Sequence, residues 1–136
     1  MRLVDANVIV GLLIPSTPWS DDARALYLRD PDWHTEGHAL VELTNVLVRL
    51  VRTGDLTRTQ ARAALAEAQG RLQRGLFAAE HDPALQAALA HGVSAYDARY
   101  LVAAKALEIQ LITEDQRLRA KAPKLTQSVA QALAES

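Results

Sequence analysis

Apolar residues follow two different spacings along this chain. Short stretches of strand length lie at residues 3–10, 33–35, 75–79, 109–113 and 124–126. Such stretches are typical of buried strands, whereas recurrence every three or four residues is typical of an amphipathic helix. The first stretch contains two polar residues and can turn early into a helix. We therefore expect five strands, of which the first can end before its apolar run does.

Between these stretches, apolar residues recur at helical spacing, and local signals indicate the helix ends. We expect helices over residues 21–29, 39 to about 54, 57 to about 70, 83–92, 96–107, 115–120 and 128–134. Ser20 and Ser94 can cap two of them, and Thr57 with Gln60 has the spacing of a capping box. Strands that alternate with helices predict an α/β fold, in which a mainly parallel sheet carries helices on both faces.

The composition limits the class of protein. A chain of 136 residues is expected to form one domain over residues 1–136 and to need no disulfide or zinc for stability. Cysteine is absent, which excludes disulfides, thiolate zinc sites and cysteine nucleophiles. The formal net charge of −1 provides no overall attraction to nucleic acid or membrane. No segment approaches the ~20 apolar residues of a spanning helix, so we expect a soluble, cytoplasmic protein.

Most of the fifteen basic residues are arginines, whose planar side chains match phosphate and carboxylate groups. Four of them, Arg49, Arg52, Arg58 and Arg62, lie close together in the sequence. They can form ordinary solvated helix faces, or a local surface that binds phosphate or an acidic partner.

Four acidic residues stand where a predicted strand ends or a predicted helix begins: Asp5, Glu42, Asp97 and Asp115. They are far apart in the sequence, but an α/β fold would bring such positions to one edge of the sheet. Clustered carboxylates repel one another unless a cation joins them. A hard divalent cation such as Mg²⁺ takes oxygen ligands and commonly serves phosphate chemistry. The pattern therefore indicates a metal-dependent phosphoryl-transfer enzyme and favours a nuclease.

Considered alone, each acid also has a structural explanation. Asp5 has the clearest case for function, because a carboxylate among apolar neighbours costs free energy unless it is paired. The alternative for Asp5 is a structural hydrogen bond to a loop. Glu42 borders the apolar face of its helix and can equally be a solvated residue. Asp97 follows Ser94 by three residues, as in a capping motif, and Asp115 can cap the helix after it.

Other constellations of residues are weaker. His34 and His38 are four residues apart, but no third zinc ligand accompanies them. The chain has no glycine-rich nucleotide-binding loop and no nucleophile elbow. The two tryptophans and three tyrosines are scattered. We expect them to be core or partner-contact residues rather than a base-stacking platform.

Four motifs in order resemble those of PIN-domain ribonucleases, and specifically the VapC toxins of bacterial and archaeal toxin–antitoxin pairs. The first is Val4-Asp5-Ala6-Asn7, and the second is the helix around Glu42 at residues 40–47. The third spans residues 94–104 and contains Asp97, and the fourth is Thr113-Glu114-Asp115. Each motif is short, but four in this order, at usual spacings in a chain of usual length, are specific.

The resemblance implies a three-layer α/β/α sandwich and Mg²⁺- or Mn²⁺-dependent cleavage of RNA. It also implies a homodimer and a small antitoxin whose C-terminal segment blocks the acidic site. On this hypothesis one or two ions are held by three aspartates, with a glutamate as ligand directly or through water: Asp5, Asp97, Asp115 and Glu42. Two polar residues, Asn7 and Thr113, would fix the carboxylates in place.

Several alternatives stay open from the sequence. Arg99 departs from the small or apolar residue that is usual in the third motif, and it could reach a phosphate or pair with an acid. The chain could bind RNA or a partner without cleavage, or process RNA without being a toxin. A haloacid dehalogenase-type phosphatase would need a second Asp where Asn7 stands. A receiver domain would need adjacent acids after the first strand, and Asp21-Asp22 lie elsewhere.

Overall fold

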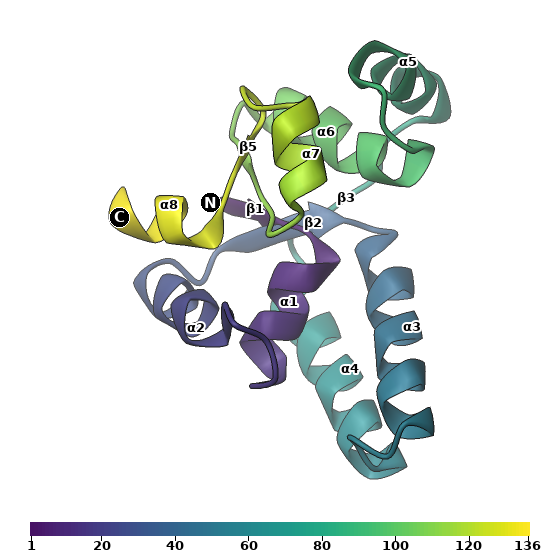
Figure 1. Ribbon diagram of the computed structural model, residues 1–136, viewed down its shortest axis with the longest axis vertical. Helices are drawn as coiled ribbons and strands as arrows, with labels where there is room; N and C mark the ends of the chain where they lie inside the picture. The colour runs from purple at the N-terminus through teal and green to yellow at the C-terminus, as the bar shows by residue number, and fades with distance from the viewer.

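Five short parallel strands form the central sheet of the computed structural model, which describes residues 1–136 (Figure 1). They are β1 (Arg2–Val4), β2 (Trp33–Glu36), β3 (Leu76–Phe77), β4 (Leu111–Ile112) and β5 (Thr126–Gln127). The strand order in the sheet is β3-β2-β1-β4-β5, and every neighbouring pair is parallel. The chain therefore reverses its direction across the sheet at β1. In open α/β sheets, ligands bind outside the carboxyl ends of the strands at such a reversal.

Eight helices cover the sheet. They are α1 (Ala6–Leu13), α2 (Ser20–Arg29), α3 (Ala39–Arg52), α4 (Arg58–Leu72), α5 (His81–His91), α6 (Ala95–Leu107), α7 (Gln116–Lys121) and α8 (Val129–Ala134). In the view of Figure 1, α1 to α4 lie below the sheet and α5 to α7 lie above it. This arrangement confirms the predicted three-layer α/β/α fold with a parallel sheet. None of the helices is long and apolar enough to cross a membrane.

The core lies where the two helical layers meet the sheet. The strand residues Leu3, Val4, Leu111 and Ile112 are at most 1% exposed, and they belong to one cluster of 25 buried apolar residues. The register pairs Leu3 with Leu111 and Val4 with Ile112. Because β1 and β4 run in parallel at this register, the residues that follow them in the chain emerge side by side at the carboxyl edge of the sheet.

The first apolar stretch is divided between a strand and a helix. Residues 3–10 were predicted as a strand that can turn early, and β1 ends at Val4 while α1 begins at Ala6. The division occurs because the Asp5 carboxylate accepts a hydrogen bond from the backbone N–H of Val8 at 3.1 Å and so caps α1. Periodicity alone does not distinguish a short buried strand from a buried helix.

The predicted helix caps are confirmed in most cases. Thr57 forms the expected capping box with Gln60, and Ser94 caps α6. The prediction for Ser20 was wrong, because Ser20 lies inside α2 and its hydroxyl donates to the Ile14 carbonyl at 2.9 Å instead. The Ser20 hydroxyl therefore fixes the loop before α2 rather than the first turn of the helix.

Candidate functional site

Asp5 stands at the centre of the carboxyl edge of the sheet. Its side chain is buried, with 5% of the residue exposed. One carboxylate oxygen accepts from the Val8 N–H, and the other accepts a short hydrogen bond from the Thr113 hydroxyl. The carboxylate therefore has a fixed orientation, because both of its oxygens are held by the ends of different elements.

Thr113 connects Asp5 to Asp115. It follows β4, is fully buried, and accepts a hydrogen bond from the Asp115 backbone N–H at 3.1 Å while it donates to Asp5. Asp115 in turn caps α7, since its Oδ1 accepts from the N–H groups of Arg117 and Leu118 at 3.0 and 3.1 Å. Its Oδ2 makes no hydrogen bond within the chain. One Asp115 oxygen thus anchors the helix, and the other is available to a ligand.

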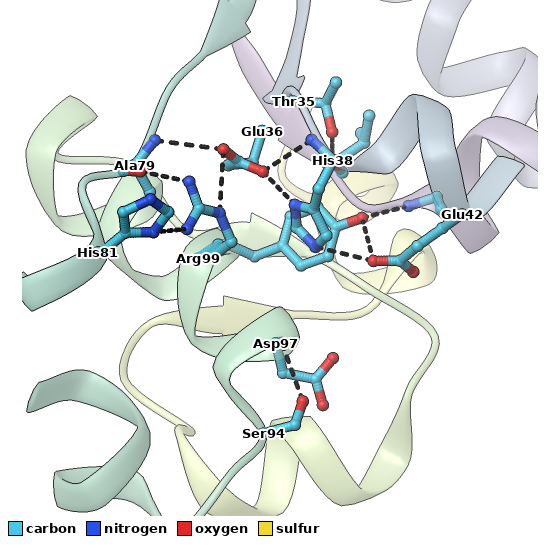
Figure 2. Close-up of polar contacts among 12 residues, drawn as sticks. Thr35, Glu36, His38, Glu42, Ala79, His81, Ser94, Asp97 and Arg99 are labelled. Atoms are coloured by element: carbon cyan, nitrogen blue, oxygen red, sulfur yellow. Dashed lines mark hydrogen bonds and ion pairs between the residues drawn. The ribbon is translucent and has the colours of Figure 1, made fainter. Parts of the chain in front are cut away.

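Asp97 lies in the first turn of α6. Its backbone N–H donates to the Ser94 hydroxyl at 3.1 Å, which is the capping contact expected from the sequence. Its carboxylate makes no hydrogen bond within the chain and is drawn free of the other residues in Figure 2. The structural and functional interpretations of Asp97 are therefore compatible, because the cap uses the backbone and leaves the carboxylate free.

Glu42 lies in the first turn of α3 with 41% of its side chain exposed. Its Oε1 accepts from the Tyr100 hydroxyl at 3.3 Å and lies 2.8 Å from His38 Nε2. This contact with His38 is an ion pair when the imidazole is protonated. The Tyr100 hydroxyl also accepts from the Ala6 N–H at 3.2 Å and so joins the start of α1 to Glu42.

The four acids act on one another electrostatically. Burial raises the pKa of Asp5 to about 7, and the charges of Glu42 and Asp115 add to this against the hydrogen bonds from Thr113 and Val8. Burial likewise raises the pKa of Asp97, followed by repulsion from Asp115 and Glu42. The sheet edge thus gathers the four predicted carboxylates into one negative region.

The carboxylates suit a divalent cation by their chemistry. They offer hard oxygen ligands, no lysine or arginine offsets their mutual repulsion, and free oxygens remain on Asp97 and Asp115. No three Asp, Glu or His side chains already point their donor atoms at one common position. A bound ion would therefore require the free carboxylates to turn toward it, while the doubly held Asp5 stays in place.

Asn7 and Thr113 were both predicted to fix these carboxylates. Thr113 contacts Asp5 and Asp115, whereas Asn7 does not. Its side chain is exposed and makes no hydrogen bond to an acid, while its backbone carbonyl accepts from the Trp19 indole N–H at 2.9 Å. Its role beside the metal stays a prediction.

A second acidic network, which the sequence did not predict, is buried and reaches Glu42 through His38 (Figure 2). Its centre is Glu36, which ends β2 and is 2% exposed. One carboxylate oxygen accepts from the His38 N–H at 2.8 Å and contacts His38 Nδ1. The other accepts from the Ala79 N–H at 3.2 Å and lies 3.4 Å from Arg99 Nε. Burial alone would raise the pKa of Glu36, but the contacts with His38 and Ala79 outweigh it and lower the pKa.

The network answers the question left open for Arg99. Its guanidinium pairs with Glu36, donates to the Ala79 carbonyl and lies 3.3 Å from His81 Nδ1. Of the two sequence hypotheses for Arg99, this geometry matches pairing with an acid. Glu36 is an acid at a strand end, which is the signal that identified Asp5, so the same criterion could have found it.

His38 joins the two acidic groups. It contacts Glu36 through Nδ1 and Glu42 through Nε2, and its ring packs 4.5 Å from the ring of Tyr100. Burial lowers the pKa of His38, but the two carboxylates outweigh it and raise the pKa. His34 points elsewhere, with Nε2 2.9 Å from Asp32. The two histidines therefore contact different acids, His34 with Asp32 and His38 with Glu36 and Glu42, and do not face a common site.

Comparisons with known proteins agree with the fold and the motif order. Residues 2–124 match the family model described as PIN domain. Ribonuclease VapC3 from Pyrobaculum aerophilum is 32% identical over 126 residues, which cover 90% of this chain and 95% of that protein.

Solved structures show the same fold at lower sequence identity. PAE2754 from Pyrobaculum aerophilum aligns with a TM-score of 0.76 and 24% identity over 98% of this chain and 87% of that one. VapC20 from Mycobacterium tuberculosis, a toxin that cleaves the sarcin–ricin loop, aligns with a TM-score of 0.65 and 23% identity over 88% and 94%. FitAcB from Neisseria gonorrhoeae aligns with a TM-score of 0.67 and 18% identity over 96% and 99%.

The raised pKa of Asp5 predicts a pH-dependent stability for the metal-free protein. Between about pH 4 and pH 7 the folded state holds a proton that the unfolded chain has lost, so the free energy of unfolding falls as pH rises. In the presence of a chelator, thermal unfolding should show higher stability at pH 5 than at pH 8. Asp5→Asn should reduce this difference, and the surface control Asp22→Asn should keep it. An unchanged pH dependence in Asp5→Asn would contradict the assignment.

The Glu36 network predicts that Arg99 stabilises the fold. Arg99→Ala should cost about 3 kcal/mol in denaturant unfolding, because it leaves a buried carboxylate without its guanidinium partner. Arg62→Ala, which removes an exposed arginine with no ion pair, should change stability by no more than about 0.5 kcal/mol. The double variant Glu36→Gln/Arg99→Ala should lose less than the sum of the single variants. Additive losses would show that the two side chains are not coupled.

Proposed function

The chain belongs to the PIN domain family, in its VapC branch, and on that premise we propose that it is a divalent-metal-dependent endoribonuclease. The observation that carries the proposal is the group of four carboxylates around buried Asp5, which repel one another and are paired with no lysine or arginine. Glu36, the other buried acid of this chain, is by contrast paired with Arg99. A site kept negative at the carboxyl edge of the sheet suits Mg²⁺ or Mn²⁺.

Each acid has a distinct part in holding the metal. Asp5 is the rigid ligand, because Val8 and Thr113 hold both of its oxygens. Asp115 contributes its free Oδ2 while Oδ1 stays on α7. Asp97 contributes a carboxylate that makes no other hydrogen bond, from α6, on the side of the sheet opposite α1 and α3 (Figure 1). Glu42 serves directly or through a water, and its position is set by His38 and Tyr100.

The chemistry needs no nucleophilic side chain. A Mg²⁺ or Mn²⁺ ion held by Asp5, Asp97 and Asp115 would supply a lowered pKa for a water, orientation of the scissile phosphate and stabilisation of the leaving 3′-oxygen. The chain's own residues fix the geometry, since Thr113 ties Asp5 to Asp115. Burial raises the pKa of Tyr100, so its hydroxyl stays protonated as a hydrogen-bond donor to Glu42. In-line attack by water would leave a 5′-phosphate on the product.

The biological role follows from the same premise. We propose that residues 1–136 form a single PIN domain that acts as the toxin of a toxin–antitoxin pair, works as a homodimer, and is inhibited by a small antitoxin that blocks the acidic site. The likeness to ribonuclease VapC3 supports this role. A neighbouring reading frame for a small protein with a DNA-binding head and an apolar, arginine-containing tail would separate a toxin from an RNA-processing nuclease.

The proposed function predicts that Asp97→Ala abolishes most RNA cleavage while the protein stays folded. Removing a metal ligand from a site based on electrostatic stabilisation should lower the rate by at least about 100-fold. The rate should be measured on single-stranded RNA with Mg²⁺ and with Mn²⁺, and product ends tested for a 5′-phosphate. In the chelated protein, relief of repulsion should leave the melting temperature of Asp97→Ala equal to or above that of the parent.

The matched control is Asp82→Ala, which removes an acid from the first turn of α5 outside the site. It should cleave RNA at the parent rate. Parent-like cleavage by Asp97→Ala would contradict the site assignment. Metal binding by the parent with no cleavage of any RNA would favour an RNA- or partner-binding role instead.

A further inference from the structure

One aromatic ring of this chain is exposed beside the acidic site. Trp33 and Tyr100 are each 2% exposed, and Tyr27 packs edge-to-face against Trp33 with ring centroids 5.2 Å apart. Tyr96 differs, because it is 70% exposed in the first turn of α6 and directly precedes Asp97. The sequence predicted that the scattered aromatic residues are core or partner-contact residues, and the exposure of Tyr96 shows that it is not part of the core.

Tyr96 forms one wall of a hollow between α3 and α6. The hollow has a volume of about 510 Å³ and is lined by six residues: His38, Val41, Glu42, Asn45, Tyr96 and Asp97. His38 is the N-cap of α3, and Val41, Glu42 and Asn45 follow it by three, four and seven residues, so all of them lie on one face of that helix. Val41 is also 65% exposed, so the hollow has a second apolar surface open to solvent. The volume lies in the range of small-molecule sites.

The ring of Tyr96 is supported from inside. His38 lies 6.3 Å away between ring centroids at an interplanar angle of 33°. His38 is itself held by Glu36 and packed against Tyr100. One side of the Tyr96 ring therefore rests near a fixed imidazole, and its exposed side faces solvent.

The charge of the walls restricts what the hollow can hold. Glu42 and Asp97 contribute carboxylates, and no lysine or arginine lines it. A second hollow, of about 260 Å³, is lined by Arg117 and Lys121 together with the acids Asp97 and Asp115. The two cations can bind phosphate on the α7 side, whereas the α3 side favours an uncharged group with a flat apolar face and hydrogen-bonding edges.

We propose that the hollow between α3 and α6 binds one unstacked nucleobase of the RNA, next to the scissile phosphate, with the base stacked on Tyr96. Unpaired bases are recognised by stacking on aromatic side chains and by hydrogen bonds to their edges. Asn45 offers an amide that can both donate and accept at the base edge. The inference rests on the proposed nuclease function, because the shared walls Glu42 and Asp97 place the base beside the metal site.

The test compares Tyr96→Ala, Tyr96→Phe and the control Leu89→Ala on a random-sequence pool of single-stranded RNA. Leu89 is 77% exposed on α5 and does not line the hollow. Tyr96→Ala should lower kcat/KM by about 10- to 100-fold and flatten the base preference at one position beside the cut, as expected for loss of one stacked base. Tyr96→Phe keeps the ring and should stay within about 3-fold of the parent. Leu89→Ala should match the parent.

A substrate with an abasic residue at that one position separates stacking from a structural effect. The parent should lose about the same factor on the abasic RNA as Tyr96→Ala loses on the intact RNA, and combining the two changes should cost little more. Additive losses would overturn the inference, as would parent-like kinetics and base preference in Tyr96→Ala, or equal losses in Tyr96→Phe and Tyr96→Ala.

The same assay separates this inference from the function on which it rests. A parent protein that cleaves no RNA with Mg²⁺ or Mn²⁺ overturns the nuclease function and the base site together. An active parent whose Tyr96→Ala variant cleaves normally, but escapes inhibition by a partner protein, overturns only the base site and assigns the hollow to that partner.

Discussion

A carboxylate enclosed at the carboxyl end of the central strand is the constraint on which the rest of this structure depends. Asp5 directly follows β1 and caps α1, and its second oxygen is held by Thr113, which directly follows β4. One residue therefore fixes the strand–helix junction and the relation between the two central strands. Its orientation is set before any ligand arrives, at a cost in desolvation that the surrounding apolar core offsets.

The protein treats its buried acids in two different ways. Glu36 receives donors from His38 and Ala79 together with the guanidinium of Arg99, so its charge is matched within the fold. The acids around Asp5 receive backbone and hydroxyl donors but no lysine or arginine. The Glu36 network and the four acids thus differ in one respect, because only Glu36 is paired with a permanently charged side chain, that of Arg99. We regard this contrast as stronger support for a metal site than the number of acids alone.

His38 and Tyr100 connect these two groups. The His38 ring lies between Glu36 and Glu42, and the Tyr100 hydroxyl reaches both Glu42 and the start of α1. The network around Glu36 therefore helps to hold Glu42, one of the four acids, in position through His38. This is how structural and functional acids can be neighbours and still have separate roles.

The sequence predicted the fold well because alternation and cap signals are local. The order of strands and helices follows from spacing, and Thr57 and Ser94 cap helices as expected. The four acids were predicted from the motif order, and the structure places them at one edge. The predicted Ser20 cap is absent because Ser20 lies within α2, where its hydroxyl donates to the Ile14 carbonyl.

The place of Glu36 at a strand end was readable from the sequence, but the long-range contacts that complete the site were not. Glu36 meets Ala79 across 43 residues, and Tyr100 meets Glu42 across 58. These contacts depend on strand register and helix packing, which a single sequence does not display. Tyr96 illustrates the same limit, because only the packing of α6 against the α3 side shows that its ring lies exposed at the site, whereas Trp33 and Tyr100 are buried.

The central claim is that the four carboxylates are a metal site, and the most direct measurement is anomalous X-ray scattering from crystals grown with Mn²⁺. The account predicts an anomalous peak at the carboxyl edge of the sheet, with oxygens of Asp5 and Asp97 as direct ligands and Asp115 turned toward the ion through its free oxygen. Saturating Mn²⁺ with no peak at this edge, or a peak held by other residues while the four acids keep their present positions, would contradict it.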